Sequence, residues 1–217
     1  RDYYVYWSFE WDAFYIHYGG PFYIDEVINR PDTEDIDGLS SSNFWRANDT
    51  GSSTDNAYVD TEGIKADINK LGYSMQYRDG YASEEHYQFA PDNAPNTLDQ
   101  YSDAITAGKI DMSPTYPVTN CYFIYNAETG LYDRYQHLSG TADGPHIDKA
   151  NGKQLAFKNV LIHNTYFEVR DQKGYLAFQC IDSTRDGWFF TNGKGIHVTW
   201  EKTSDFGPTR YFDDNGN

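Results

Sequence analysis

The chain has 217 residues, a formal net charge of −16 and an aromatic content of 18%, including 20 tyrosines. This length holds one large or two modest domains, and a hydrophobic content of 39% argues against bulk disorder. The excess of carboxylates repels phosphate groups, which argues against nucleic acid as a partner and against binding to an anionic membrane surface by charge alone.

The first thirty residues predict two short helices with a strand between them. Residues 2–11 place aromatic and acidic residues at helical spacing, with Asp2 positioned as a cap, although a strand is the competing interpretation of so aromatic a run. Residues 13–17 predict a buried strand that ends at the Gly19-Gly20 turn. Residues 22–29 predict a short helix that closes before a proline.

A long polar stretch and a clear helix follow. Residues 31–56 are rich in Asp, Ser and Asn and predict an irregular segment, a kind of segment that is often functional when it is this long. The helix begins after a cap at Asp60 or Thr61 and ends at Gly72. Its apolar face is formed by Ile64, Ile68 and Leu71.

The second half of the chain predicts strands. Four prolines between residues 90 and 117 indicate a boundary, so we predict a mixed α/β domain over 1–95, a linker over 96–117 and a β-rich domain over 118–217. Strands are expected at 118–125, 132–137, 155–169, 174–182, 187–191, 195–202 and 208–212, with a polar loop at 139–152. The predicted fold class is α+β, a mixed α/β N-terminal half followed by a β-rich C-terminal half.

The cysteines and the chain ends bear on location. Cys121 and Cys180 fall in predicted strands and outside any zinc spacing, which predicts two buried free thiols, with a disulfide as the alternative in an oxidising location. No segment approaches the ~20 apolar residues of a membrane span, and no signal peptide is present. Because the chain opens in mid-pattern at Arg1 and stops in a turn at 214–217, we expect a piece of a longer protein.

Short pieces spread along the chain resemble one family. They are residues 1–3, 17–20, 44–46 and 56–58 in the first half, and 132–134, His146 with Asp148, 158–160, 200–202 and 208–216 in the second half. Their order and spacing are similar to the YerB-like bacterial lipoproteins, a domain-of-unknown-function family. The resemblance implies a two-part α+β protein that is exported and held on the outer face of a bacterial membrane by an N-terminal lipid outside this chain.

One departure from that family bears on chemistry. Thr54-Asp55 stand where the family usually has Pro-His, so no role of that histidine carries over to this chain. The resemblance itself supplies no reaction.

Two groups of polar residues in the first half predict a binding site. The first is Arg1, His17 and the Gly19-Gly20 turn, which could hold an anion because glycines let backbone N–H groups approach a ligand closely. Its alternative is a tight turn with a satisfied histidine.

The second group lies just before the clear helix, at a helix N-terminus that favours anionic groups. It consists of Arg46, Asp55, Asn56 and Tyr58. Its alternative is a helix cap beside a solvated loop. If the two groups converge, Asp55 is the candidate catalytic acid or base.

Two groups in the second half carry weaker signals. Tyr132 and Arg134 flank the polar loop, in which Asp143, His146 and Asp148 could coordinate a cation; the spacing matches no standard metal loop, and a structural Arg–Asp pair is the alternative. The last group has two interpretations: the first is core packing, and the second is a tryptophan that stacks on a sugar. That group is Asn159, Trp200 and Lys202.

We predict no metal site and no cofactor, since the sequence has no GxSxG, HExxH, Walker or GxGxxG motif. The sequence leaves open whether the protein is an enzyme. The first hypothesis is an extracytoplasmic, lipid-anchored envelope protein that binds a protein partner or a cell-wall component through the polar cleft of its first half. The alternative is a hydrolase of a glycan or cell-wall polymer, in which His17 and Arg46 assist Asp55. A structural spacer is the third possibility.

Overall fold

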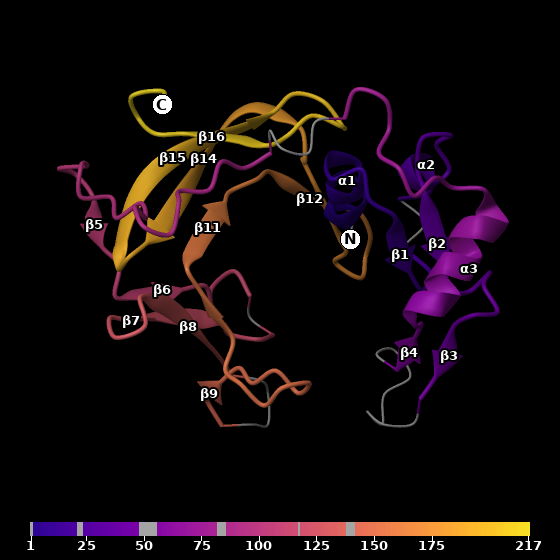
Figure 1. The fold of residues 1–217 in the computed structure, drawn as a ribbon, viewed down its shortest axis with the longest axis horizontal. Coiled ribbons are helices and arrows are strands. Elements are labelled where there is room, and N and C mark those ends of the chain that lie inside the picture. Colours follow the sequence, from indigo (N-terminus) through magenta and orange to yellow (C-terminus); the bar gives the residue numbers. More distant parts are fainter. Residues whose placement is uncertain (1, 21–23, 48–55, 82–85, 117, 138–141) are drawn as a thin grey trace. The chain divides into compact units, whose positions relative to one another are not determined.

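The computed structural model describes residues 2–20, 24–47, 56–81, 86–116, 118–137 and 142–217. Contacts divide the chain into two compact units, each assembled from three segments. The first unit holds Arg1–Tyr87, Thr165–Ser183 and Lys202–Arg210, and the second holds Gln88–Asn164, Thr184–Glu201 and Tyr211–Asn217. Figure 1, coloured along the sequence, shows these segments by their colours.

The aromatic run at the N-terminus forms a helix, α1 (Tyr3–Glu10), so the strand interpretation of residues 2–11 is wrong. One carboxylate oxygen of Asp2 accepts a hydrogen bond from the backbone N–H of Tyr3, and the other accepts from the N–H of Phe178. Val5 and Phe9, one turn apart, are buried. Their spacing of four residues gives the helix one inward face, as an amphipathic helix requires.

The strand predicted at 13–17 is confirmed in position as β1 (Tyr15–His17), which pairs in parallel with β2 (Asp35–Asp37). The prediction that it is buried is wrong, because Ile16 is 39% exposed. Next come the short helix α2 (Asp25–Ile28) and the antiparallel pair β3 (Trp45–Arg46) and β4 (Ala57–Tyr58). The stretch predicted as irregular over 31–56 therefore contains β2 and β3.

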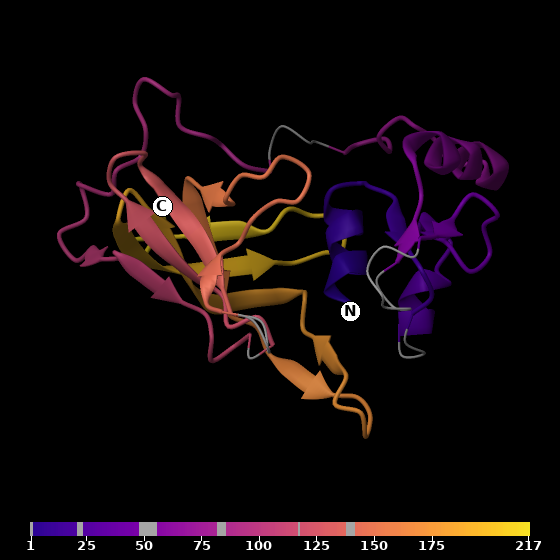
Figure 2. The same cartoon turned by 90° about the horizontal axis from the view of Figure 1, so that it is seen from below.

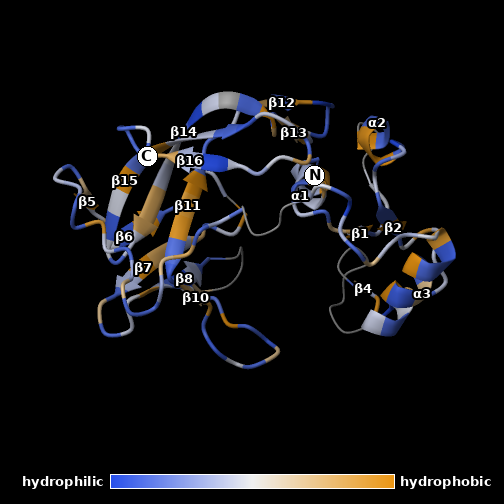
Figure 3. Cartoon of the chain, turned by 45° about the horizontal axis from the view of Figure 1, so that its top comes forward, coloured by the Kyte–Doolittle hydropathy of each residue, from blue (hydrophilic) through white to orange (hydrophobic). Residues whose placement is uncertain are grey.

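The clear helix of the sequence is α3 (Thr61–Leu71), and both of its predicted ends are confirmed. The Asp60 carboxylate accepts from the N–H of Gly63 at 2.7 Å, and Gly72 ends the helix with a φ of 75°. Ile68 is buried, and Figure 3 shows hydrophobic and hydrophilic positions on the same helix. Local capping signals thus fix this element.

Later segments complete the first unit. β12 (Phe167–Val169) and β13 (Leu176–Phe178) form an antiparallel hairpin, and residues 202–210 reach α1 through Glu10. None of the helices in the described part of the chain is both long and apolar enough to span a membrane.

Two sheets build most of the second unit, and their paired strands can be followed in Figures 1 and 2. The first has the order β10-β8-β7-β6, with β9 paired to β8, and the second has the order β11-β14-β15-β16, with β5 paired to β15. The strands of the first are β6 (Lys109–Asp111), β7 (Tyr122–Asn126), β8 (Leu131–Gln136), β9 (Gly144–Pro145) and β10 (Ala156–Phe157). Those of the second are β5 (Ile105–Thr106), β11 (Asn159–His163), β14 (Asp182–Thr191), β15 (Lys194–Lys202) and β16 (Arg210–Phe212).

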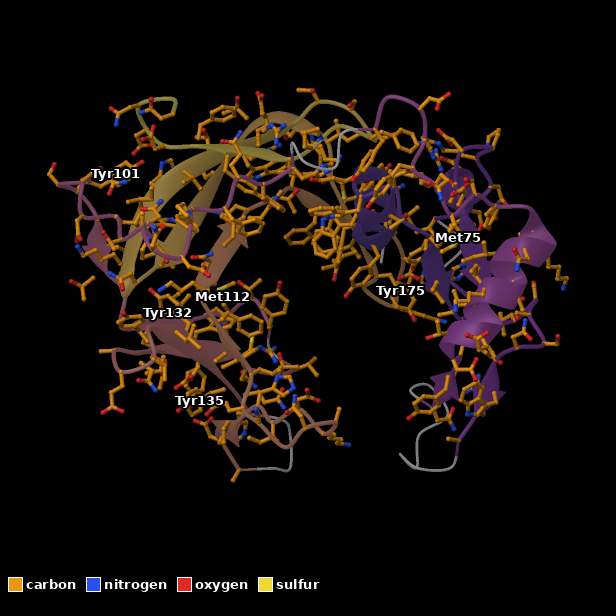
Figure 4. All side chains as sticks on the ribbon, viewed as in Figure 1. Met75, Tyr101, Met112, Tyr132, Tyr135 and Tyr175 are labelled. Carbon is orange, nitrogen blue, oxygen red and sulfur yellow. The ribbon has the colours of Figure 1, made fainter. Side chains whose placement is uncertain are left out.

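The core of this unit is aromatic and aliphatic. Tyr132 is fully buried in a cluster with Ala107, Ile110 and Phe190, and Met112 packs against the same cluster (Figure 4). A second cluster contains Leu98, Ile196 and Val198. Residues 96–117, which the sequence analysis assigns to a linker, therefore include the buried Leu98 and the strands β5 and β6. The α+β class with a β-rich second half is confirmed.

Both cysteines are free thiols. Cys121 is buried, whereas Cys180 is half-buried, and each lies just outside a strand. Burial raises the pKa of the Cys180 thiol to about 12, so this sulfur is protonated and a poor nucleophile at neutral pH.

Candidate functional site

The histidine of the predicted glycine turn has partners on both sides. Its Nε2 lies 3.0 Å from Oδ2 of Asp35 and its Nδ1 lies 2.8 Å from the carbonyl oxygen of Gly19. The N–H of Gly19 in turn donates to Asp37 at 2.9 Å. His17 is thus held in a closed local network, the arrangement that the tight-turn alternative describes. Arg1 lies outside the described residues, so a role for this group in binding stays a prediction.

The second predicted group is brought together by β3 and β4. Nη1 of Arg46 donates to Oδ1 of Asn56 at 2.7 Å, and its guanidinium lies 4.6 Å from the centre of the Tyr18 ring. Tyr58 stacks on its cross-strand neighbour Trp45, with ring centres 6.3 Å apart. Asp55, the candidate acid or base, lies outside the described residues, so its convergence with His17 stays untested.

The predicted cation group around residues 132–148 is structural. Arg134 donates to Nδ1 of His146 rather than pairing with Asp148, so the expected Arg–Asp pair is wrong. Asp148 instead accepts from the N–H of Ala150 in its own turn, and Asp143 accepts from the Tyr122 hydroxyl. Nowhere in the described residues do three or more potential ligands gather into a metal site.

The last predicted group belongs to the interior. Trp200 is fully buried and its indole N–H donates to the carbonyl of Asn164 at 2.7 Å, which confirms core packing and excludes stacking on a sugar. Lys202 is also buried, and its Nζ lies 3.4 Å from Oε2 of Glu10.

The structure reveals an aromatic groove that the sequence analysis did not predict. Its volume is about 610 Å³, and its lining includes Tyr4, Trp7, Trp11, Phe14, Tyr15 and Ile16. We call this site the aromatic groove. Tyr4, Trp7 and Trp11 are 48%, 52% and 41% exposed. Exposed tryptophans gathered in one concavity mark a binding surface more strongly than scattered ones do.

Helix geometry explains the groove. Residues 4, 7 and 11 are separated by three and four positions, so their side chains form one stripe along α1, while Val5 and Phe9 point inward. This spacing is visible in the sequence. The three positions form a stripe only if the run is a helix, and a strand is the competing interpretation of this run.

Neighbouring rings hold the walls of the groove in place. Tyr4 and Trp7 meet edge to face at 5.7 Å, and Tyr15 stacks on His17 at 4.8 Å. Phe14 stacks on Tyr73 at 5.9 Å. Burial raises the pKa of Tyr15, so its phenol is neutral at physiological pH. Among the described residues, those lining the groove carry no formal charge, so it offers flat aromatic faces to a ligand.

A buried ion pair fixes the end of the same helix. Glu10 accepts from the N–H of Thr209 at 2.7 Å and from its hydroxyl at 2.9 Å, and it faces Lys202. Burial lowers the pKa of Lys202, and the nearby Glu10 opposes this shift. All these contacts are internal, so the pair positions α1 rather than a ligand.

Comparisons with known proteins agree on a family. Residues 1–74 match the "Protein of unknown function (DUF3048) N-terminal domain", and residues 112–217 match the corresponding "C-terminal domain". Among curated proteins, no sequence matches the chain. The crystal structure of the YerB protein from Bacillus subtilis is similar, with a TM-score of 0.68 and 19% identity, over 99% of this chain and 66% of that chain.

This chain thus spans about two thirds of the length of its YerB neighbour, and at such low identity the likeness shows the fold alone. The two family models, one in each half, confirm the resemblance expected from the sequence. The chain belongs to the DUF3048 family of YerB-like proteins.

Proposed function

We propose that this protein is a binding module of the bacterial cell envelope that holds a glycan segment of the cell wall in the aromatic groove. The observation that carries the proposal is the stripe of Tyr4, Trp7 and Trp11, three large rings exposed along an open, shallow groove of about 610 Å³. Because the groove is open to solvent, it suits one face of an extended chain better than an enclosed small ligand.

The chemistry of the groove favours a sugar. Pyranose rings present apolar C–H faces that pack on flat aromatic side chains, while their hydroxyls stay in water. The lining offers rings and no formal charge, and the molecule as a whole carries −16, so a ligand recognised mainly through its negative charge is a poor match. Rings already held by their neighbours lose little entropy on binding.

The proposed location rests on the family resemblance. The resemblance to the YerB-like lipoproteins supports export and attachment to the outer face of the membrane through an N-terminal lipid outside this chain. Cell-wall glycan is available there. A protein partner, the other ligand class expected from the sequence, is an outcome of the test below. No observation favours the hydrolase alternative, which depends on Asp55.

The test is co-sedimentation with purified, insoluble cell wall. We expect the chain to sediment with cross-linked wall from which proteins have been removed, and we expect soluble glycan strands freed of stem peptides to compete for this binding. We expect Trp7→Ala to weaken binding about tenfold, which corresponds to about 1.4 kcal/mol, because the substitution removes a stacking face.

The matched control is Trp45→Ala, in the same unit, since Trp45 is 48% exposed but lies outside the groove. Equal losses in the two variants would mean that general hydrophobicity drives sedimentation. Binding that disappears when wall proteins are removed would assign the groove to a protein partner instead.

A further inference from the structure

A second cavity of the first unit lies apart from the predicted site residues. Its volume is about 450 Å³. The residues that matter for its chemistry are Arg78, Asp79, Tyr81, His86, Phe206 and Pro208. We call it the His86 pocket. Its lining shares no residue with that of the aromatic groove, and the inference does not depend on the function proposed for that groove.

His86 is an unusual histidine. It is only 5% exposed, and neither ring nitrogen has a hydrogen-bond partner among the described residues. Its ring stacks on Trp11 at 4.5 Å and lies 5.5 Å from the Tyr81 ring. By contrast, both ring nitrogens of His17 face acceptors. A buried polar group without partners lowers stability, and such exceptions are concentrated at functional sites.

The other groups of the pocket are partly satisfied and nearly neutral in sum. Nε of Arg78 lies 2.8 Å from Oδ1 of Asp12, and Nη2 donates to the carbonyl of Asp32 at 2.8 Å. No hydrogen bond within the described residues uses Nη1. The Tyr81 hydroxyl donates to the carbonyl of Glu10 at 3.1 Å. The described lining carries one cation, Arg78, and one anion, Asp79, and Arg78 is also paired with Asp12 and Glu34 outside the lining. The pocket therefore offers donors and acceptors without a net positive charge.

We propose that the His86 pocket binds a small neutral ligand through an amide group. A neutral imidazole has one N–H donor and one acceptor nitrogen, and an amide presents the complementary carbonyl and N–H. The Nη1 of Arg78 supplies a further donor to the carbonyl. Because both nitrogens of His86 are shielded from solvent, the ligand must displace a neighbouring ring, and Tyr81, which also lines the cavity, is the ring that we assign.

The direct test is an NMR titration of the unmodified chain. The probe is N-methylacetamide, and the matched control is methyl acetate, which has nearly the same shape but no N–H. Both compounds are compared by the dissociation constant that the His86 ring signals report. The constant for the amide should be at least about fivefold lower than that for the ester. Equal shifts with both compounds, or none with either, would overturn the proposal and leave His86 as a structural residue.

Two substitutions test the chemistry further. We expect His86→Phe, which keeps the stacked ring but removes both nitrogens, to abolish amide binding without lowering the unfolding temperature of the free chain. Asp79→Asn is expected to leave amide affinity within about twofold, because an exposed carboxylate has no role in holding a neutral ligand.

Loss of amide binding in Asp79→Asn would show that this carboxylate holds the amide, and would overturn the assignment of the contacts to His86 and Arg78. Unchanged binding in His86→Phe would overturn the role of the imidazole. If His86→Phe does not fold, amide titrations of the unmodified chain and of Asp79→Asn still test whether the pocket binds a neutral amide. Trp7→Ala is the control for the aromatic groove, and it is expected to bind the amide as the unmodified chain does.

Discussion

The side chain of Trp11 contributes to both cavities of the first unit. It lines the aromatic groove and stacks on His86, which lines the other cavity. Its place at the C-terminal end of α1 accounts for both contacts. A substitution at Trp11 would therefore disturb two sites, which is why Trp7 is the better probe of the groove.

At the residue scale, the buried pair of Glu10 and Lys202 makes a stability prediction. Both side chains are almost fully buried, so Lys202→Met leaves a carboxylate without its counter-charge. We expect a loss of about 3–5 kcal/mol in the free energy of unfolding, measured by urea denaturation. Lys65→Met, which removes an exposed lysine paired with Glu62, should cost less than about 0.5 kcal/mol. Similar losses in the two variants would contradict a tightly coupled buried pair.

A second residue-scale prediction concerns pH. The hydrogen bond to Asp214, at 2.6 Å, raises the pKa of His197, with a smaller contribution from Asp186 at 3.4 Å. Because the folded pKa is raised, the stabilisation is fully present below the unfolded value of about 6.5 and is lost as the pH rises through the folded value.

The measurement is an NMR titration of the His197 ring in the unmodified chain, Asp214→Asn and Asp186→Asn. We expect a midpoint above about 6.5 that falls markedly in Asp214→Asn and less in Asp186→Asn. A larger fall in Asp186→Asn would reverse the assigned order of the two carboxylates.

At the scale of elements, predictability depends on how local the signals are. The ends of α3 were predicted correctly because Asp60 and Gly72 act within their own turns. The N-terminal run was ambiguous, since its choice of helix depends on burying Val5 and Phe9 against distant parts of the chain. The hairpin between β14 and β15, predicted as strands at 187–191 and 195–202, also carries a local signal. Asn192 and Gly193 have φ values of 51° and 73°, as a two-residue hairpin turn requires.

The end of α3 gives a prediction at this scale. Gly72 has a positive φ and open space around its missing Cβ, so Gly72→Ala should destabilise the chain by about 1 kcal/mol through backbone strain alone. Gly108 also has open space but no positive φ, so Gly108→Ala should be neutral or slightly stabilising. Urea denaturation of the two variants measures the difference. Equal effects would mean that the turn after α3 does not need a left-handed residue.

At the scale of the whole molecule, the sequence predicted the class of fold but not which segments share a unit. Thr165–Ser183 and Lys202–Arg210 belong with the N-terminal residues. The bonds that hold them there, from Phe178 to Asp2 and from Thr209 to Glu10, join residues more than 170 positions apart, and no local pattern marks them. The site was affected in the same way. Polar residue types point to Arg46 and His17, whereas the groove is formed by an aromatic stripe.

Location gives a further prediction for the whole molecule. If the protein is exported and lipid-anchored as proposed, protease added to intact cells without an outer membrane should degrade the full-length form. A cytoplasmic marker in the same cells should survive, and this marker is the control. Protection equal to that of the marker would contradict the proposed location without testing the groove.

The central claim is that the aromatic groove holds a glycan, and calorimetric titration tests it most directly. Oligosaccharides released from cell-wall glycan strands and freed of peptide are titrated into the unmodified chain, Trp7→Ala and Trp45→Ala. The account predicts saturable binding that is about tenfold weaker in Trp7→Ala and unchanged in Trp45→Ala. Absence of binding to the unmodified chain, or equal affinity in all three proteins, would contradict it.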